Sequence, residues 1–153
     1  MTNQGLQNLI SEWIPNLEFS EEESEFLNIF VSPEHLYDLM LRLRDHKETA
    51  FDYLFCLSGV DWGEELGIVY HLESTVHRHI IVVKVKTEDR ERPNFDSVCD
   101  IWRTAEFHER EVFDYFGVTF NNHPNMTHLF LNDEWQGHPL RKDFEDPVNM
   151  IIR

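Results

Sequence analysis

Cysteine is scarce in this chain. Its 153 residues include only two cysteines, Cys56 and Cys99, and they form no CxxC pair. An iron–sulfur cluster normally takes four cysteine ligands, so this chain cannot supply a full set alone. Apolar neighbours flank both positions, which favours buried free thiols over a disulfide framework and indicates a reducing compartment.

Glycine-rich motifs and long hydrophobic runs are missing too. Six glycines occur, and none forms GxGxxG or GxxxxGK[ST], which argues against a self-contained nucleotide site. Ser58-Gly59 is not flanked as a nucleophile elbow would be, and no residue is predicted as a catalytic nucleophile. No window approaches eighteen apolar residues, and the N-terminus shows no secretory signal. Any membrane association is therefore expected to come through a partner.

Basic residues are few. Lys and Arg total 13 against 29 Asp and Glu, which gives a net charge of −16. Phosphate recognition needs clustered Lys and Arg, so the composition argues against a nucleic-acid partner and against direct docking on anionic lipid. A basic protein partner stays possible.

Apolar and aromatic residues, by contrast, are plentiful. Hydrophobic residues make up 41% and aromatic residues 13%, with twelve Phe and four Trp. This composition fits one domain with a sizeable core. The large flat side chains suit either a core or a protein interface.

Hydrophobic periodicity predicts an α+β domain. We expect helices over 6–13, 34–48 and 105–116, a helical stretch over 95–104, and strands over 26–31, 51–60, 67–75 and 79–86, the last two paired as a hairpin. Gly117 is expected to end the helix before it in the left-handed conformation. The predicted fold is a single domain with a mainly antiparallel sheet of about four strands flanked by helices. Residues 1–120 would form its body, and residues 121–153 an extended C-terminal strap of the same domain.

A charged motif occupies the last predicted helix. It contains Glu109, Arg110, Glu111 and Asp114, and the four-residue spacing would place Arg110 between the carboxylates of Glu106 and Asp114. The simplest interpretation is a solvated charged face with weak ion pairs. A hydrolase with paired carboxylates is the sharper alternative.

Nine histidines raise the question of a metal. His77 and His79 share one side of a predicted strand start, and His71 lies on the preceding strand, so the three could form a zinc site of a stand-alone enzyme. His108 and His123 could add ligands. No HExxH or Cys/His spacing supports this hypothesis.

A second motif, WQGHPLRKDF, lies near the C-terminus. Pro139 holds His138 extended. Trp135, Leu140 and Phe144 would act as apolar anchors around the charged Arg141, Lys142 and Asp143. Such a segment could cross another protein's surface, or it could pack on its own domain.

Together these two motifs resemble a known family. The sequence EREVFDYFGVTF, followed by HP at 123–124 and then by W-x-GHPLRKDF, is similar to the 30 kDa-type subunit, also called the C subunit, of NADH:quinone oxidoreductase (respiratory complex I). The matching core covers 109–144, and the strand that ends in Ser58-Gly59-Val60-Asp61 also fits. Related domains occur in membrane-bound hydrogenases and formate-hydrogenlyase-type complexes.

The resemblance implies a non-catalytic α+β subunit that binds no redox centre or cofactor itself. NAD, FMN, iron–sulfur clusters and quinone would belong to the assembled, proton-translocating complex. The expected partners are the large quinone-site (49 kDa-type) subunit and the adjacent iron–sulfur subunits of the peripheral arm. The expected location is the cytoplasmic side of the bacterial inner membrane. Within the two motifs, the resemblance assigns organising and contact roles to Glu109, Arg110, Glu111, Asp114, His123, Trp135, His138, Arg141, Lys142 and Asp143.

Two departures from the family pattern stand out. Thr127 occupies a position where the family usually has a basic residue, next to His128. The charged contact of the family pattern is therefore not expected from position 127. The sequence also stops at Arg153, so a short, free-standing version of the subunit is expected.

Overall fold

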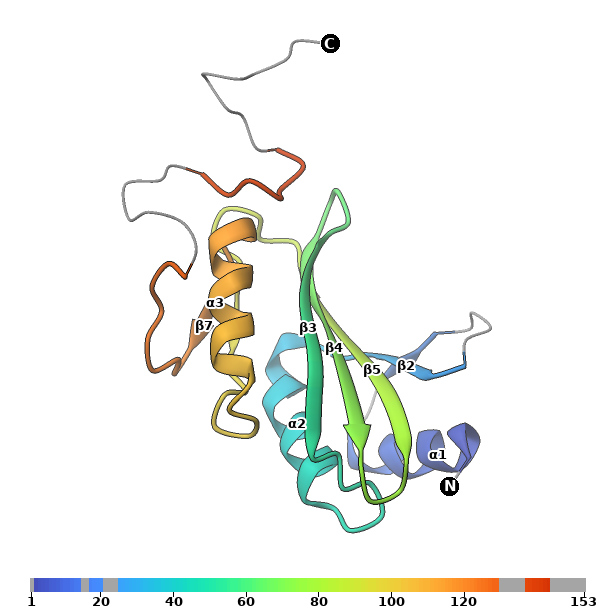
Figure 1. Ribbon diagram of the computed structural model, residues 1–153. Coiled ribbons are helices and arrows are strands. Elements are labelled where there is room, and N and C mark those ends of the chain that lie inside the picture. The colour runs from blue at the N-terminus through green and yellow to red at the C-terminus, as the bar shows by residue number, and fades with distance from the viewer. Residues whose placement is uncertain (1, 15–16, 21–24, 130–136, 144–153) are drawn as a thin grey trace.

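The computed structural model describes residues 2–14, 17–20, 25–129 and 137–143 (Figure 1). Its helices are α1 (Asn3–Trp13), a 3₁₀ turn (Pro33–His35), α2 (Leu36–Asp45) and α3 (Ala105–Phe116). Its strands are β1 (Glu18–Phe19), β2 (Leu27–Phe30), β3 (Tyr53–Asp61), β4 (Leu66–Ser74), β5 (His79–Thr87), β6 (Asn94–Asp96) and β7 (Thr119–Asn121).

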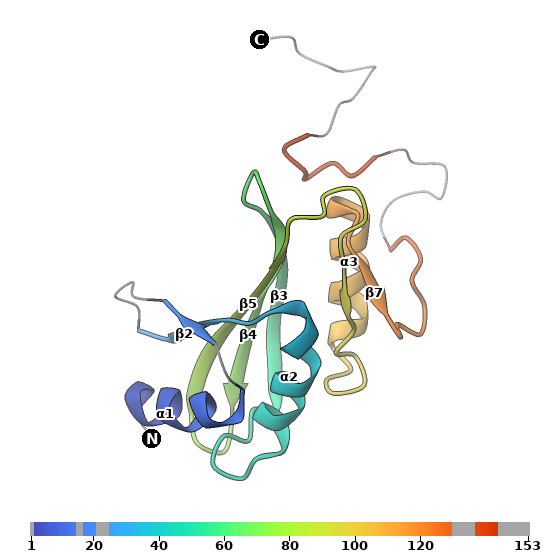
Figure 2. The ribbon, with the colours of Figure 1, turned by 180° about the vertical axis from the view of Figure 1, so that it is seen from behind.

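The main sheet has five strands in the order β1-β2-β5-β4-β3. Strands β3, β4 and β5 form an antiparallel meander, and β2 pairs with β5 in parallel. Helices α1 and α2 cover one face of this sheet, whereas α3 lies beside β3 (Figures 1 and 2). The expected α+β fold and the β4–β5 hairpin are confirmed. The short strand β1 was not predicted.

The core forms between the sheet and the two covering helices, and it continues to α3, β6 and β7 through Val112, Phe95 and Phe120. Leu36, Leu39, Met40 and Leu43 recur at helical spacing on α2 and are all fully buried. The alternate residues Ile81, Val83 and Val85 of β5 are also fully buried. The helical spacing in α2 and the alternation in β5 thus indicate, from the sequence alone, which side chains of each element face the core.

A second, two-stranded sheet lies next to α3. Strand β6 pairs in parallel with β7, which joins Asn94 to Thr119 and Asp96 to Asn121. The helix expected over 95–104 is therefore wrong. Its helical spacing reflects one turn only, in which the amides of Ile101 and Trp102 both donate to the carbonyl of Val98. Pairing of the 94–96 backbone with a distant strand overrides that local pattern.

Gly117 ends α3 as predicted. Its φ is 75°, in the left-handed region, and its amide donates to the carbonyl of Phe113. A Cβ at this glycine would lie 2.6 Å from the His138 ring, so the absent side chain also makes room for the C-terminal motif. In the described part of the chain, none of the helices has the length and apolar character needed to cross a membrane.

Candidate functional site: helix α3 and the residues tied to it

Glu109 lies inside the domain. It is fully buried, and its Oε1 accepts hydrogen bonds from Ser97 Oγ at 2.9 Å and from the Val98 amide at 3.1 Å. Its Oε2 has no hydrogen-bond partner among the described residues. Burial outweighs these two bonds and raises the pKa of Glu109 to about 8, so this carboxyl is mostly protonated at neutral pH.

Asp114 is the second buried carboxylate of α3, and it binds the segment that follows β7. Its Oδ1 accepts from His128 Nδ1 at 2.7 Å, and its Oδ2 accepts from the Leu129 amide at 3.0 Å. Its backbone carbonyl accepts from Nδ1 of His138 at 3.1 Å. Asp114, a residue of the first motif, therefore holds the His128 ring, the Leu129 amide and the histidine of the second motif.

Arg110, which is half-buried, also binds this segment. Its guanidinium donates to the carbonyls of Thr127 and His128, at 3.1 and 2.9 Å, and to the hydroxyl of Thr127 at 3.2 Å. The expectation of a solvated charged face is wrong for Glu109 and Asp114, because both are fully buried. At the position where the family usually has a basic residue, Thr127 accepts hydrogen bonds from the Arg110 guanidinium.

His123 and Glu111 have contrasting positions. His123 Nδ1 accepts from the Asn125 amide, which leaves Nε2 to donate to the carbonyl of Glu106 at 3.0 Å. This bond fixes the start of the segment after β7 against α3. Glu111 is exposed and lines a groove of about 240 Å³ between α3 and β3, together with Ser58 and Leu140.

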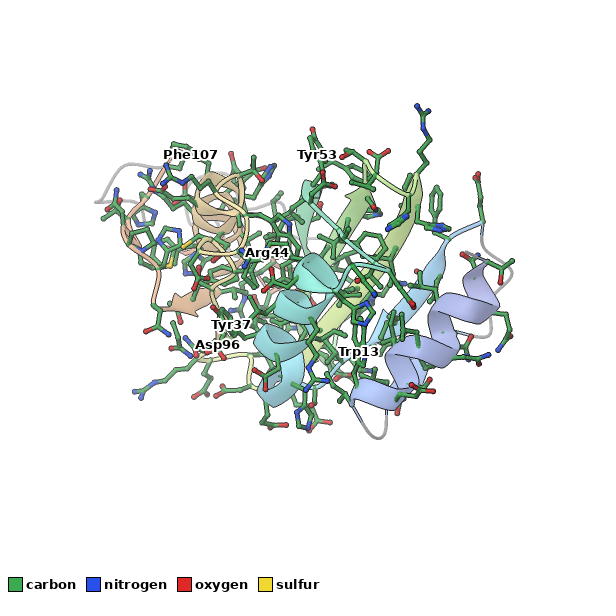
Figure 3. All side chains as sticks on the ribbon, turned by 90° about the horizontal axis from the view of Figure 1, so that it is seen from below. Trp13, Tyr37, Arg44, Tyr53, Asp96 and Phe107 are labelled. Atoms are coloured by element: carbon green, nitrogen blue, oxygen red, sulfur yellow. The ribbon has the colours of Figure 1, made fainter. Side chains whose placement is uncertain are left out.

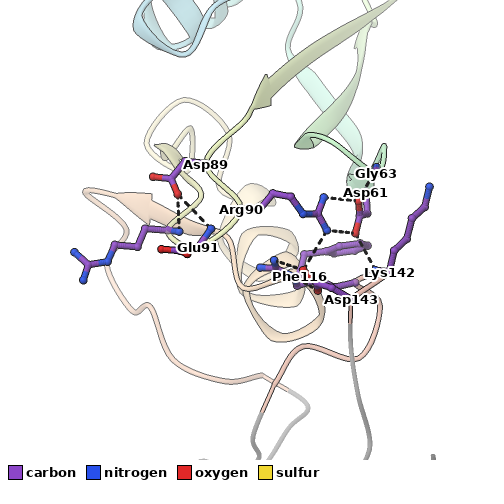
Figure 4. A network of polar contacts seen from close by, with 10 residues as sticks. Asp61, Gly63, Asp89, Arg90, Glu91, Phe116, Lys142 and Asp143 are labelled. Carbon is purple, nitrogen blue, oxygen red and sulfur yellow. Dashed lines mark hydrogen bonds and ion pairs between the residues drawn. The ribbon is translucent and has the colours of Figure 1, made fainter. Parts of the chain in front are cut away.

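Asp61, at the end of β3, is the centre of a charged network (Figure 4). Arg90 binds it with both terminal nitrogens, at 2.7 and 2.8 Å, and the amides of Gly63 and Lys142 each donate to it at 2.8 Å. With Arg90 as the largest cause, these donors hold the pKa of Asp61 well below its usual range. Asp61 therefore stays ionised although its side chain is only 2% exposed.

Residues 137–143 close the network. Arg141 donates to both carboxylate oxygens of Asp143, at 2.8 Å each, and Arg90 reaches Asp143 at 3.3 Å. Lys142 contributes its backbone amide, while the residue itself is exposed. Of the two interpretations left open for this segment, packing on its own domain is observed for these residues. Trp135 lies outside the described residues.

The three histidines proposed as zinc ligands do not assemble. His71 packs its ring against Phe55, at 5.7 Å between centroids, and His77 Nε2 bonds to the carbonyl of Lys47 at 2.8 Å. No group of three His, Cys, Asp or Glu residues in the described ranges could hold a metal ion. The residues present therefore give no support to a stand-alone metal enzyme.

Sequence reasoning missed Asp61 and Arg90 as site residues. In the sequence, Asp61 stands out only as the end of a strand that fits the family pattern, and Arg90, 29 positions further on, is not singled out at all. An aspartate two residues before a glycine does indicate an Asx turn, which the Gly63 bond confirms. The partner of that aspartate had no local signal.

The fold and the site define a one-domain α+β protein in which a polar C-terminal segment is tied to the end of one helix and one strand. Residues 29–148 match the family described as "Respiratory-chain NADH dehydrogenase, 30 Kd subunit". The chain belongs to this family.

Curated relatives agree with this assignment. The chain is 52% identical over 124 residues to the NADH-quinone oxidoreductase C/D subunit of Phocaeicola vulgatus, a match that covers 80% of this chain and 24% of that protein. It is 42% identical over 126 residues to the NADH-quinone oxidoreductase C subunit of Roseiflexus castenholzii, which covers 78% of this chain and 72% of that protein. The chain thus spans about a quarter of the C/D relative and most of the Roseiflexus relative.

A solved structure shares the fold. The chain resembles one chain of the membrane-bound sulfane sulfur reductase (MBS), an archaeal respiratory membrane complex, with a TM-score of 0.77 and 29% identity. The match covers 95% of this chain and 86% of that one.

Proposed function

We propose that this chain is a non-catalytic subunit in the peripheral arm of a proton-translocating NADH:quinone oxidoreductase. It would brace the large quinone-site (49 kDa-type) subunit and contact the adjacent iron–sulfur subunits. The observation that carries the proposal is the 52% identity to a C/D-type protein. The matched region makes up 24% of that protein's length. In that relative, a region like this chain is one part of a larger polypeptide, so a structural role beside a larger partner follows naturally.

The redox chemistry would take place in the partners. NAD, FMN, the iron–sulfur clusters and quinone are proposed to be bound elsewhere in the assembled complex. Two cysteines are too few for the usual cluster ligand set, which supports this division of labour. The complex would place the chain at the cytoplasmic side of the bacterial inner membrane, held there by its partners.

The 137–143 segment is proposed to present the partner contact. Arg141 and Asp143 bind each other, and Arg90 and the Lys142 amide fix the segment to Asp61. Leu140 and Lys142 remain accessible to a partner, because Leu140 is 56% exposed and Lys142 is exposed as well. Arg141 would thus hold the backbone in place, while Leu140 and Lys142 would touch the neighbour.

The test is co-purification from the native organism with an affinity tag on this chain. We expect the large quinone-site subunit to co-purify and the preparation to reduce quinone with NADH. Arg141→Ala should lower the yield of the large subunit, because the segment loses its internal clamp. Arg92→Ala is the matched control, since Arg92 is exposed and bonds to Asp89 through its backbone amide. Unchanged assembly and activity in Arg141→Ala would count against the strap role.

A second candidate is the equivalent subunit of another membrane-bound respiratory complex, such as a hydrogenase or a formate-hydrogenlyase-type complex. The TM-score of 0.77 to a chain of an archaeal sulfane sulfur reductase complex supports this alternative, because that chain has the same fold in a different respiratory membrane complex. The same tagged preparation separates the two proposals. NADH-oxidising subunits support the first, and a nickel-binding large subunit supports the second.

A further inference from the structure

The main sheet has one face that α1 and α2 leave open. These two helices pack on the opposite face, and Figure 3 shows Tyr53 and Phe107 on the side of the molecule away from them. Strand register places Tyr53, Cys56 and Ser58 of β3 beside Glu73, His71 and Val69 of β4 on this open face. We call it the open sheet face.

A bulge in β3 concentrates aromatic side chains at one end of this face. The pairing with β4 shifts between Leu54 and Cys56, so Phe55 has no partner in the ladder. Bulges re-aim side chains in this way. Tyr53 and Phe55 lie 6.1 Å apart by ring centroids, and Phe55 lies 5.7 Å from His71, which makes one continuous aromatic row.

These aromatic rings are exposed to a degree that folding alone does not explain. Tyr53 is 50% exposed and Phe55 is 38% exposed. Both could have been polar at no cost to the core, since Leu54 and Leu57 fill the buried side of the same strand. Tyr and Phe are both enriched in protein interfaces, and Tyr is among the residues most enriched at their energetic centres.

The charged and neutral side chains of the open sheet face define the surface that a partner would need. Glu73 lies opposite Tyr53 in the register, and Lys84 of β5 lies beside Val69. Burial, with help from Lys84, lowers the pKa of His71, so its ring is neutral at pH 7 and suits a dry contact. An apolar surface with a basic side chain opposite Glu73 and an acidic one opposite Lys84 would match this arrangement.

A second copy of this chain fits less well than a different protein. The net charge is −16, so two copies repel each other at low salt. A different occupant is indicated by the C/D relative, in which the matched region accounts for 24% of the polypeptide. The remainder of that polypeptide is held at one-to-one stoichiometry with a region like this chain.

We propose that the open sheet face, centred on Tyr53, Phe55 and His71, is a docking surface for the large subunit that corresponds to the remainder of a C/D-type polypeptide. This inference rests on the proposed function for the identity of the partner. It adds a second contact area, which borders the 137–143 segment where Ser58 and Leu140 line the same groove. The large subunit would cover the aromatic row with an apolar patch and satisfy Glu73 and Lys84 with opposite charges.

The experiment measures binding of the full chain to the separately purified large subunit from the same organism. Tyr53→Ala and Phe55→Ala should each raise Kd by roughly tenfold or more, because exposed aromatics at an interface centre carry much of the affinity. Lys84→Glu should weaken binding without removing an aromatic ring. Val76→Ala is the matched control, since Val76 is 70% exposed and lies in the turn between β4 and β5. Thermal unfolding of each variant separates lost binding from lost folding.

The outcomes distinguish this inference from the proposed function. If wild type binds and the three face variants bind equally well, the docking surface is overturned while the proposed function stands. If wild type does not bind the large subunit at all, both fail. If sedimentation shows that the free chain self-associates and Phe55→Ala abolishes this, the face joins two copies and the inference is wrong.

Discussion

Two buried carboxyl groups in this domain, Asp61 and Glu109, have opposite electrostatic environments. The oxygens of Asp61 accept from both terminal nitrogens of Arg90 and from two backbone amides, and its pKa falls. Glu109 accepts from Ser97 and Val98 on one oxygen, its other oxygen has no partner in the described ranges, and its pKa rises to about 8. The contrast shows that the supply of donors, more than burial itself, decides whether a buried acid stays ionised.

The strongest test of this contrast removes the ionised acid. Asp61→Ala leaves Arg90 without its main partner and frees the amides of Gly63 and Lys142, so we expect a loss of about 3 kcal/mol of unfolding free energy in urea denaturation. Asp45→Ala is the control, because its ion pair with Arg44 is exposed and its removal should leave stability nearly unchanged. Equal effects of the two variants would show that Asp61 is no more than a surface ion pair.

The neutral acid should be visible in the pH dependence of stability. The pKa of Glu109 is about 8 in the folded state and about 4.3 in an unfolded chain, so between these values the folded state holds an extra proton. Stability therefore falls as pH rises, by about 1.4 kcal/mol per pH unit within that window. From about pH 5.5 to about pH 7.5, wild type should lose about 2.5 kcal/mol more than Glu109→Gln.

The comparison with Glu109→Gln isolates this effect from other groups. The pKa values of His71 and His79 are lowered by burial, so their contribution to stability rises with pH up to about 6.5. Both histidines are present in wild type and variant, and their contribution cancels in the difference. Identical pH profiles of the two proteins would show that Glu109 is ionised in the fold.

A smaller effect should separate backbone conformation from packing. Gly117 and Gly63 both have positive φ, at 75° and 96°; a Cβ at Gly117 would meet the His138 ring, whereas one at Gly63 has no described atom within 4 Å. Gly63→Ala should cost about 1 kcal/mol for its φ alone, and Gly117→Ala about 2 kcal/mol. Chemical denaturation measures both. If the two variants lose the same stability, the His138 ring moves aside freely.

The smallest effect is expected at the rim of the Asp61 network. Asp143 is more than half exposed, and it meets Arg141 and Arg90 there. Asp143→Ala should therefore lower the free energy of unfolding by only about 0.5 kcal/mol, and less at high salt. Denaturation at low and at high NaCl concentration, about 50 mM and about 500 mM, measures this. A loss as large as that of Asp61→Ala would mean that the network acts as one buried unit.

Much of the fold could be predicted because its signals are local. Strand alternation in 79–86 and helical spacing in 36–43 each fix a buried side from a few neighbouring residues. Position 117 required a left-handed residue, and glycine is present there. The parallel pair of β6 and β7 could not be predicted, because residues 94–96 gain their strand partners from residues 119–121.

The candidate site was predicted only in part. The structure brings the two motifs together through Asp114 and His138, while their role in a partner contact stays a prediction. The expected ion pairs around Arg110 were wrong in detail, because this guanidinium binds the 127–128 carbonyls. The sequence shows which residues are charged. It does not show which acceptors each one binds, because those acceptors, such as the carbonyls of residues 127 and 128, come close only in the folded chain.

The sequence by itself determined the family, the helix and strand periods, and the shortage of cluster and nucleotide ligands. Tertiary structure alone decided which charged residues are buried and which electrostatic state each adopts. The reason is range. Periodicity acts over a few residues, whereas Arg90 and Lys142 lie 29 and 81 positions from Asp61, and Ser97 and Val98 lie 12 and 11 positions from Glu109. Only the folded chain brings such groups within hydrogen-bond distance.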